Sequence, residues 1–256
     1  PLVRWKSQPV SALTKQMLFA FGLSISAALL VFFSYSQPAY MAILGLVLAF
    51  WIVICTVMEV MQRLDSLPQQ LGTRQRLSML TRSHWAMVLG HLGFAVSLIG
   101  ITLVSNYELE RDVRMSPGEQ VRVGAYQIQF DSHTTYAGPN YNADVGQFTV
   151  TRDEQEVAVL FPEKRLYLVQ KMPMTEAAID TGLTRDIFVA LGEPLNGEAW
   201  AVRIYIKPFV IWIWGGGGIM AIAGLLAVSD RRYRLNRDHR QKSRAAGSSN
   251  KTAEAL

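Results

Sequence analysis

The sequence predicts a multi-pass α-helical membrane protein with four transmembrane helices and an inserted β-rich domain. Half of the 256 residues are hydrophobic, and only 18% are charged. Four segments, residues 17–35, 39–58, 85–104 and 209–228, contain no Asp, Glu, Lys or Arg. At ~1.5 Å per residue, each is long enough to cross the roughly 30 Å hydrocarbon core of a bilayer. A polar stretch of domain size, residues 106–207, lies between the third and fourth segments.

The remaining segments connect these helices. Residues 1–16 form an N-terminal arm, residues 59–83 form a loop after the second helix, and residues 229–256 form a basic tail. The first apolar run is long enough to span and lacks the small-residue cleavage site of a signal peptide, so we expect residues 17–35 to stay in the membrane. Because the chain starts at Pro1 rather than at Met, we expect a fragment or a processed piece of a longer protein.

The distribution of charge predicts the orientation of the helices. Fifteen of the 25 basic residues lie in the arm 1–16, the loop 59–83 and the tail 229–256. Four crossings place these three segments on one side of the membrane, and the positive-inside rule identifies that side as the cytoplasm. Both termini are therefore predicted to be cytoplasmic, with residues 106–207 on the opposite side. The basic tail beside a span also indicates contact with anionic membrane lipid.

The polar segment 106–207 is acidic. It carries ten basic and fifteen acidic residues, a net charge of −5, whereas the whole chain has a net charge of +5. The pI near 9.4 therefore averages an acidic exported domain with basic cytoplasmic segments. It does not indicate a surface for nucleic acid.

The same segment is predicted to be β-rich. Short runs of Val, Tyr, Ile and Phe flank polar turns and predict three hairpins, over residues 119–130, 147–161 and 187–205. Short strands separated by polar turns favour a small sandwich or an open barrel.

The acidic domain shows no catalytic set of residues. It has no GxSxG, no HExxH and no phosphate-binding glycine loop. Its single histidine, His133, is expected to be solvated in a loop, and His239 belongs to the basic tail. The one cysteine, Cys55, lies in the second span, which excludes a disulfide framework and a CxxC redox pair. We interpret Cys55 as an apolar packing residue.

His91 is the most informative residue, because it lies about two helical turns inside the apolar span 85–104. An ionisable group is expensive there and indicates a function. The residues alone leave three roles open. His91 can form a structural hydrogen bond between helices, or relay protons together with Glu59, the carboxylate at the end of the second span. It can also be an axial haem ligand, which needs a neutral imidazole, an apolar groove and a second ligand on the opposite face. Gly90 and Gly93 would let a helix or a flat ring approach closely.

His84 cannot be the second ligand of a haem on His91. Seven residues apart on one helix, the two histidines share a face and lie ~10.5 Å apart along the axis, so they cannot reach one iron from opposite sides. His84 falls beside Trp85 at the membrane boundary, where an interfacial anchor is expected. No other span contains a histidine. Three methionines of the spans have no spacing that distinguishes them: Met41, Met58 and Met220. If His91 binds haem, the other ligand is expected outside this chain.

Seven runs of residues occur in a characteristic order along the chain. They are residues 84–96, 104–118, 138–141, 162–165, 174–180, 186–193 and 207–214. This series resembles the C-terminal portion of the CcmF family, the haem lyase component of bacterial cytochrome c maturation. The resemblance covers most of the chain and is densest from the third span to the fourth.

The resemblance implies a location in the bacterial inner membrane, with residues 106–207 forming a periplasmic β-rich domain. In that family a polytopic protein receives haem from a periplasmic haem chaperone and attaches it to the two cysteines of a CxxCH motif in apocytochrome c. Those two proteins, other maturation proteins and the missing N-terminal part of the same protein are then the expected partners. The family also holds a b-type haem between transmembrane histidines. His91 matches one of them, which implies haem b as the cofactor and His91 as an axial ligand of its iron.

Other features of the family do not occur in this sequence. The tryptophan-rich periplasmic segment and the family's remaining histidines are absent, and Ile211 stands where the family usually has Arg. Our hypothesis is therefore a C-terminal part of a haem lyase that is not catalytically competent alone. The alternative is a non-catalytic membrane scaffold whose periplasmic domain docks partner proteins, with His91 as a packing residue. A transporter is disfavoured, because the chain has no paired broken helices and no repeat.

Overall fold

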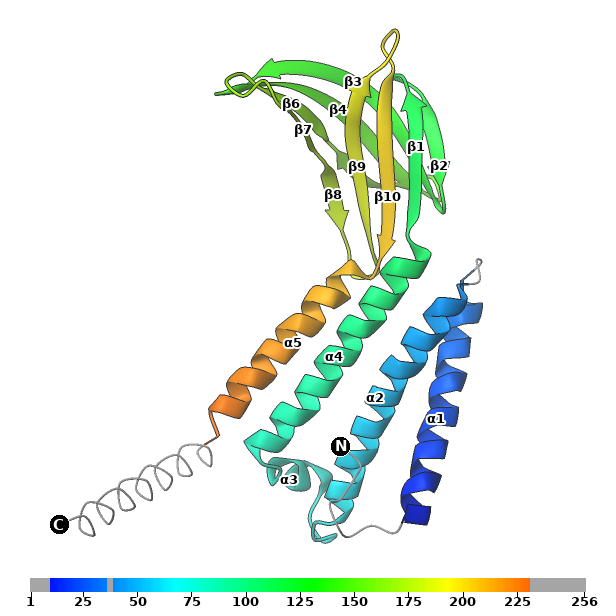
Figure 1. The fold of residues 1–256 in the computed structure, drawn as a ribbon, viewed down its shortest axis with the longest axis vertical. Helices are drawn as coiled ribbons and strands as arrows, with labels where there is room; N and C mark the ends of the chain where they lie inside the picture. Colours follow the sequence, from blue (N-terminus) through cyan, green and yellow to red (C-terminus); the bar gives the residue numbers. More distant parts are fainter. Residues whose placement is uncertain (1–9, 36–38, 231–256) are drawn as a thin grey trace, which may run out of the picture. The chain divides into compact units, whose positions relative to one another are not determined.

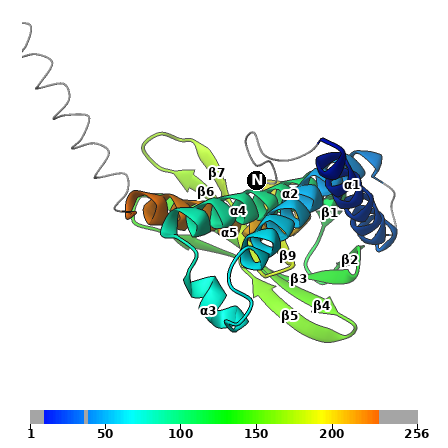
Figure 2. The same ribbon diagram turned by 90° about the horizontal axis from the view of Figure 1, so that it is seen from below.

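Four helices of the computed structural model are long and apolar enough to cross a membrane (Figures 1 and 2). They are α1 (Val10–Phe33), α2 (Tyr40–Asp65), α4 (Arg82–Tyr107) and α5 (Val210–Val228), and a short helix, α3 (Thr73–Ser78), precedes α4. The structure describes residues 10–35 and 39–230. Most of the predicted arm 1–16, residues 36–38, and nearly all of the predicted tail, including His239, lie outside the described residues.

Helices α1 and α2 pack through small and apolar side chains. Ala20 and Cys55 are buried together, and Met58 packs against them. The rings of Phe21 and Trp51 meet edge to face, with their centroids 5.5 Å apart. The thiol of Cys55 is free and buried, as expected for a packing residue.

Helices α4 and α5 approach each other closely at glycines. A Cβ atom added at Gly93 would lie 2.8 Å from the carbonyl oxygen of Gly216 and 2.9 Å from the backbone nitrogen of Met220. A Cβ at Gly216 would in turn meet Ser97. Small residues at such positions let two helix backbones come together, which is the usual packing mode in membranes. The glycine-rich composition of these two spans is thus used for their contact.

Ten strands of the described chain form the β unit, residues 109–208. They are β1 (Leu109–Met115), β2 (Gln120–Val123), β3 (Tyr126–Ala137), β4 (Tyr141–Arg152), β5 (Gln155–Leu160), β6 (Glu163–Tyr167), β7 (Pro173–Glu176), β8 (Ala178–Thr181), β9 (Arg185–Pro194) and β10 (Trp200–Pro208). Figure 1 shows two sheets. One has the order β1-β10-β9-β8, and the other has the order β2-β3-β4-β6-β7, with β5 paired to β4.

The three predicted hairpins are present in these sheets. Antiparallel pairs join β2 to β3, β4 to β5 and β9 to β10. Each pair flanks the polar turn from which it was predicted, because alternating apolar residues on both sides give each strand one face to bury.

The inner faces of the two sheets form a common hydrophobic core. Phe130 of β3 and Phe148 of β4 are fully buried and stack with their ring centroids 4.5 Å apart. The facing sheet contributes fully buried residues of β9 and β10 to the same cluster: Ile187, Val189, Leu191, Val202 and Ile204. This is the face-to-face packing of a β-sandwich. The predicted fold class, four apolar helices with an inserted β-rich domain, is therefore confirmed.

The predicted loop around His133 is wrong, because His133 lies within strand β3. The strand continues through Thr134, Thr135 and Tyr136 and pairs with β4 as far as Ala137. Thr and Tyr are strand formers, and they extend the hairpin beyond the polar residues that suggested a loop.

The run 174–180, which had no physical explanation in the sequence, carries the chain from one sheet to the other. Strand β7 pairs with β6 in the six-stranded sheet. Strand β8 follows directly and pairs with β9 in the four-stranded sheet. The run therefore forms an edge of both sheets of the sandwich.

Candidate functional site

The imidazole of His91 is held by its own helix. Its Nδ1 lies 2.8 Å from the carbonyl oxygen of Met87, one turn earlier in α4. A carbonyl oxygen only accepts hydrogen bonds, so Nδ1 must carry the proton and donate it. In the neutral ring, Nε2 then has a free lone pair. This is the usual second contact of a metal-binding histidine, which fixes the tautomer and the ring orientation.

The helix face that carries His91 differs from the face that contacts α5. At about 100° per residue, Gly90, Gly93 and Ser97 lie between roughly 100° and 160° around the helix from His91. These residues are the ones that contact α5, through Ala223 near Gly90 and through Gly216 near the other two. The ring of His91 is partly buried, and among the described residues its Nε2 has no hydrogen bond or ion pair. The nitrogen therefore has no partner in the described chain, and the ring lies on a different side of the helix from the contact with α5.

His84, for which an interfacial anchor was expected, is buried near the start of α4. Its side chain is 4% exposed, and Nε2 lies 3.5 Å from Oε2 of Glu59 in α2, whose side chain is 13% exposed. At this length the contact is not a hydrogen bond, and neither of these two atoms has a hydrogen-bond partner in the described chain. The turn between α2 and α4 brings the two side chains together. His84 thus contacts α2 and is not a partner of His91.

The structure brings no second axial ligand to His91. Met220 packs against Gly93 in the contact between α4 and α5, Met58 packs against the α1 cluster, and Met41 is 77% exposed. The described residues also contain no group of three or more His, Cys, Asp or Glu side chains that could hold a metal ion. Among the described residues, the oriented imidazole of His91 therefore has no second candidate ligand beside it.

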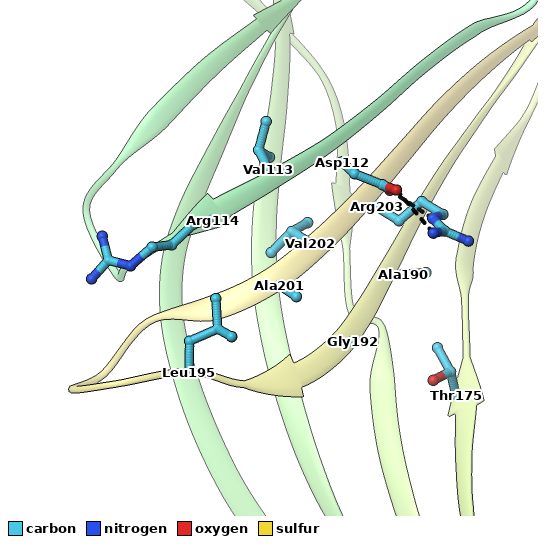
Figure 3. A pocket seen from close by; sticks show the side chains of 10 residues that line it. All are labelled: Asp112, Val113, Arg114, Thr175, Ala190, Gly192, Leu195, Ala201, Val202 and Arg203. Carbon is cyan, nitrogen blue, oxygen red and sulfur yellow. Dashed lines mark hydrogen bonds and ion pairs between the residues drawn. The ribbon is translucent and has the colours of Figure 1, made fainter.

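The β unit has an open groove on the outer face of its four-stranded sheet (Figure 3). Its volume is about 560 Å³. Small residues of β9 and β10, Ala190, Gly192 and Ala201, lie beside an ion pair between Asp112 and Arg203. The two hydrogen bonds from the guanidinium, at 2.6 and 2.9 Å, hold the pKa of the Asp112 carboxyl below its ordinary value. Asp112, the one acidic side chain that lines the groove, is thus engaged by Arg203.

A second polar cluster on the β unit includes His133. Its Nε2 lies 3.2 Å from Oδ1 of Asp144 on β4, and its ring lies 4.9 Å from the ring of Trp200. Nearby on the same two strands, Tyr136 bonds to Tyr141, which together with burial and the carboxylate of Glu163 raises the pKa of Tyr136 to about 12. These contacts explain how the side chains are held on the sheet. They form no arrangement of nucleophile, base and oxyanion donors.

Sequence reasoning missed one feature of the site, the contact between His84 and Glu59. The signal was present, because Glu59 is the one carboxylate at the end of a span and His84 begins another. The pairing itself depends on how α2 and α4 cross, which periodicity within one helix does not reveal.

Comparisons with known proteins agree with the fold and with the series of motifs. Residues 106–208 match the family model described as the CcmF C-terminal beta-sandwich. The "Cytochrome c-type biogenesis protein CcmF" of Pseudomonas aeruginosa is 46% identical over 236 residues, which are 91% of this chain and 35% of that protein. The protein of the same name in Escherichia coli K12 is 42% identical over 235 residues, again 91% of this chain and 35% of the relative.

One solved structure has the same fold. The "Cytochrome c Heme Lyase CcmF" matches 90% of this chain and 36% of its own, with a TM-score of 0.68 at 17% sequence identity. The chain thus spans about a third of the length of the relatives that it matches.

Proposed function

The chain belongs to the CcmF family, of which it is a C-terminal portion, and on this premise we propose that it is part of a haem lyase in the bacterial inner membrane. In this proposal His91 is an axial ligand of an intramembrane b-type haem. The complete protein helps to attach haem covalently to apocytochrome c. This chain supplies one half of the b-haem site, and the other axial ligand belongs to the part of the protein outside this chain.

The observation that carries the proposal is the hydrogen bond from Nδ1 of His91 to the carbonyl oxygen of Met87, at 2.8 Å. It leaves Nε2 as the coordinating nitrogen and holds the ring against rotation, which a haem ligand requires. A helix-packing histidine would instead use its outer nitrogen to bond to a neighbouring helix. Among the described residues, Nε2 of His91 makes no such bond.

The surroundings of His91 fit a flat apolar cofactor. Val88 and Ala95 share its helix face and carry no charge. When bound, a haem of this kind supplies a one-electron redox centre inside the membrane. The chain's own part is to orient the imidazole through Met87 and to fix α4 against α5 through Gly93. The surroundings also keep charged side chains away from the ring.

In this proposal the β unit binds the partner proteins. It lies in the periplasm, because the basic arm, loop and tail all fall on the other side of the four spans. Its partners are the periplasmic haem chaperone, apocytochrome c and other maturation proteins, as the family implies. Its acidic surface suits recognition of proteins better than catalysis, since the described residues include no catalytic set.

A non-catalytic scaffold is the second candidate function, and the same observations favour its docking role. The two candidates differ at His91. A scaffold needs no haem ligand there, so replacing His91 would change helix packing but not the cofactor.

Replacing His91 by Ala in the full-length protein that carries this chain is expected to abolish or strongly reduce the bound b-haem, because the loss of one axial ligand leaves an incomplete coordination sphere. The measurement is the haem content and the Soret band of protein purified in detergent. His84→Ala is the matched control on the same helix face, and it should leave the haem bound, since His84 faces Glu59. Haem loss in both variants alike would indicate general damage to α4 and would favour the scaffold.

A further inference from the structure

The contact between Glu59 and His84 is the one contact between an acidic and a basic side chain that the described structure places between two membrane-spanning helices. The side chains are 13% and 4% exposed. Neither Oε2 of Glu59 nor Nε2 of His84 has a hydrogen-bond partner, although the two atoms face each other at 3.5 Å. Removing charged groups from water without full compensation is costly. A pair kept in this condition is a candidate for a function beyond packing.

A carboxyl group and an imidazole that face each other in an apolar site are linked in their protonation. In an apolar site the favoured states are those with no net charge, either a carboxylate beside an imidazolium or a carboxylic acid beside a neutral imidazole. Both states contain one proton between the two facing atoms. Gain or loss of a proton gives the pair a net charge, and any other charge in the same low-dielectric region then shifts that equilibrium.

His91 is on the same face of α4 as His84. Seven residues separate them, so the distance along the axis is ~10.5 Å. A haem iron bound to Nε2 of His91 would gain one negative charge on reduction. Reduction therefore favours uptake of a proton by the Glu59–His84 pair, and oxidation favours its release.

We propose that Glu59 and His84 form a redox-linked proton site, which takes up a proton when the haem held by His91 is reduced. The inference rests on the proposed function of His91. The charges would balance with one electron supplied to a bound haem by an external one-electron reductant and one proton supplied to the pair by the solvent. The pair acts on the haem through its charge and does not contact it.

The charged groups on the elements around the pair are few. They are Lys15 of α1, Arg63 and Asp65 of α2, Arg74 and Arg76 of α3, Arg82 of α4 and Asp230 after α5. Asp230 accepts a hydrogen bond from the backbone of Ser83 at 3.1 Å, and no ion pair within 4.0 Å joins any of the seven to Glu59 in the described chain. The pair is thus the nearest ionisable unit to His91 on this helix face.

The test is an equilibrium redox titration of the haem in the full-length protein, with soluble mediators, between about pH 6 and pH 8. At a fixed potential, the ratio of reduced to oxidised haem is expected to rise on the order of tenfold as the pH falls over this range. The reason is that the proton adds one positive charge ~10 Å from His91, in a region of intermediate dielectric constant. In Glu59→Gln, which preserves the shape but cannot titrate, this ratio should change less than about twofold. Asp65→Asn is the matched control, an exposed acid on the same helix, and it should behave as the unchanged protein.

Each outcome decides between the two proposals. If Glu59→Gln binds haem and the ratio of reduced to oxidised haem depends on pH as in the unchanged protein, the proposed proton site is wrong. The proposal that His91 is a haem ligand is then unaffected. Absence of haem from the unchanged protein would overturn the haem ligand and the coupling together. If Glu59→Gln does not fold, the double variant Glu59→Gln/His84→Asn takes its place. It removes both ionisable groups, so no unpaired charge remains, and its pH dependence should be lost in the same way. Recovery of the pH dependence in Glu59→Asp would add support.

Discussion

Replacing Gly93 by Ala is expected to destabilise the protein by about 1–3 kcal/mol, a typical overpacking cost. The new methyl group would meet the carbonyl oxygen of Gly216 at 2.8 Å and the backbone nitrogen of Met220 at 2.9 Å. Backbone atoms cannot move aside as a flexible side chain can, so α4 and α5 must separate. The measurement is the midpoint of thermal unfolding of the full-length protein in detergent, together with its haem content, since His91 lies two residues away on α4.

Gly90→Ala is the matched control for this prediction. A methyl group at Gly90 meets only the Cβ of Ala223, at 3.9 Å, which is ordinary contact. Alanine is the better helix former by about 1 kcal/mol, so Gly90→Ala should be neutral or stabilising. Equal loss of stability in the two variants would show that glycine is needed for some reason other than the approach of α5.

Replacing Phe130 by Ala is expected to lower the stability of the β unit by about 3–5 kcal/mol, as is usual for a large buried aromatic residue. Phe130 is fully buried between the two sheets and stacks on Phe148. Hydrogen–deuterium exchange of peptides from β9 and β10 reports this loss directly, because these strands form the opposite side of the core. Exchange should accelerate in Phe130→Ala.

The control for the core prediction is Phe161→Ala. The Phe161 side chain is 54% exposed, so its removal leaves no cavity and should change exchange little. Unchanged exchange in Phe130→Ala would contradict the description of the β unit as a sandwich with one shared core.

The sequence was sufficient to predict the helices and the hairpins, because their signals are local. The four spans follow from charge-free segments of membrane length, and the hairpins follow from apolar alternation around polar turns. The pairing of β1 with β10 was not predictable in this way. It depends on contacts between distant residues, which leave no periodic pattern in the sequence.

The two histidines of α4 illustrate the same limit at the site. Helix geometry alone was enough to exclude His84 as a ligand of the same iron as His91. That His84 is buried against Glu59 depends on the crossing of α2 and α4, and was therefore missed. The bond from His91 to Met87 was accessible in principle, since a residue four positions earlier in a helix always offers its carbonyl, but its formation depends on the rotamer of the ring.

The central claim, that His91 is one of two axial ligands of a haem, is tested most directly by chemical rescue. The measurement is the visible absorption spectrum of the full-length protein carrying His91→Gly, recorded with and without added imidazole. We expect the variant to lose its b-haem Soret band and to regain it with imidazole, which fits the space of the missing ring and supplies the coordinating nitrogen. Unchanged haem content and an unchanged Soret band without imidazole would contradict the claim.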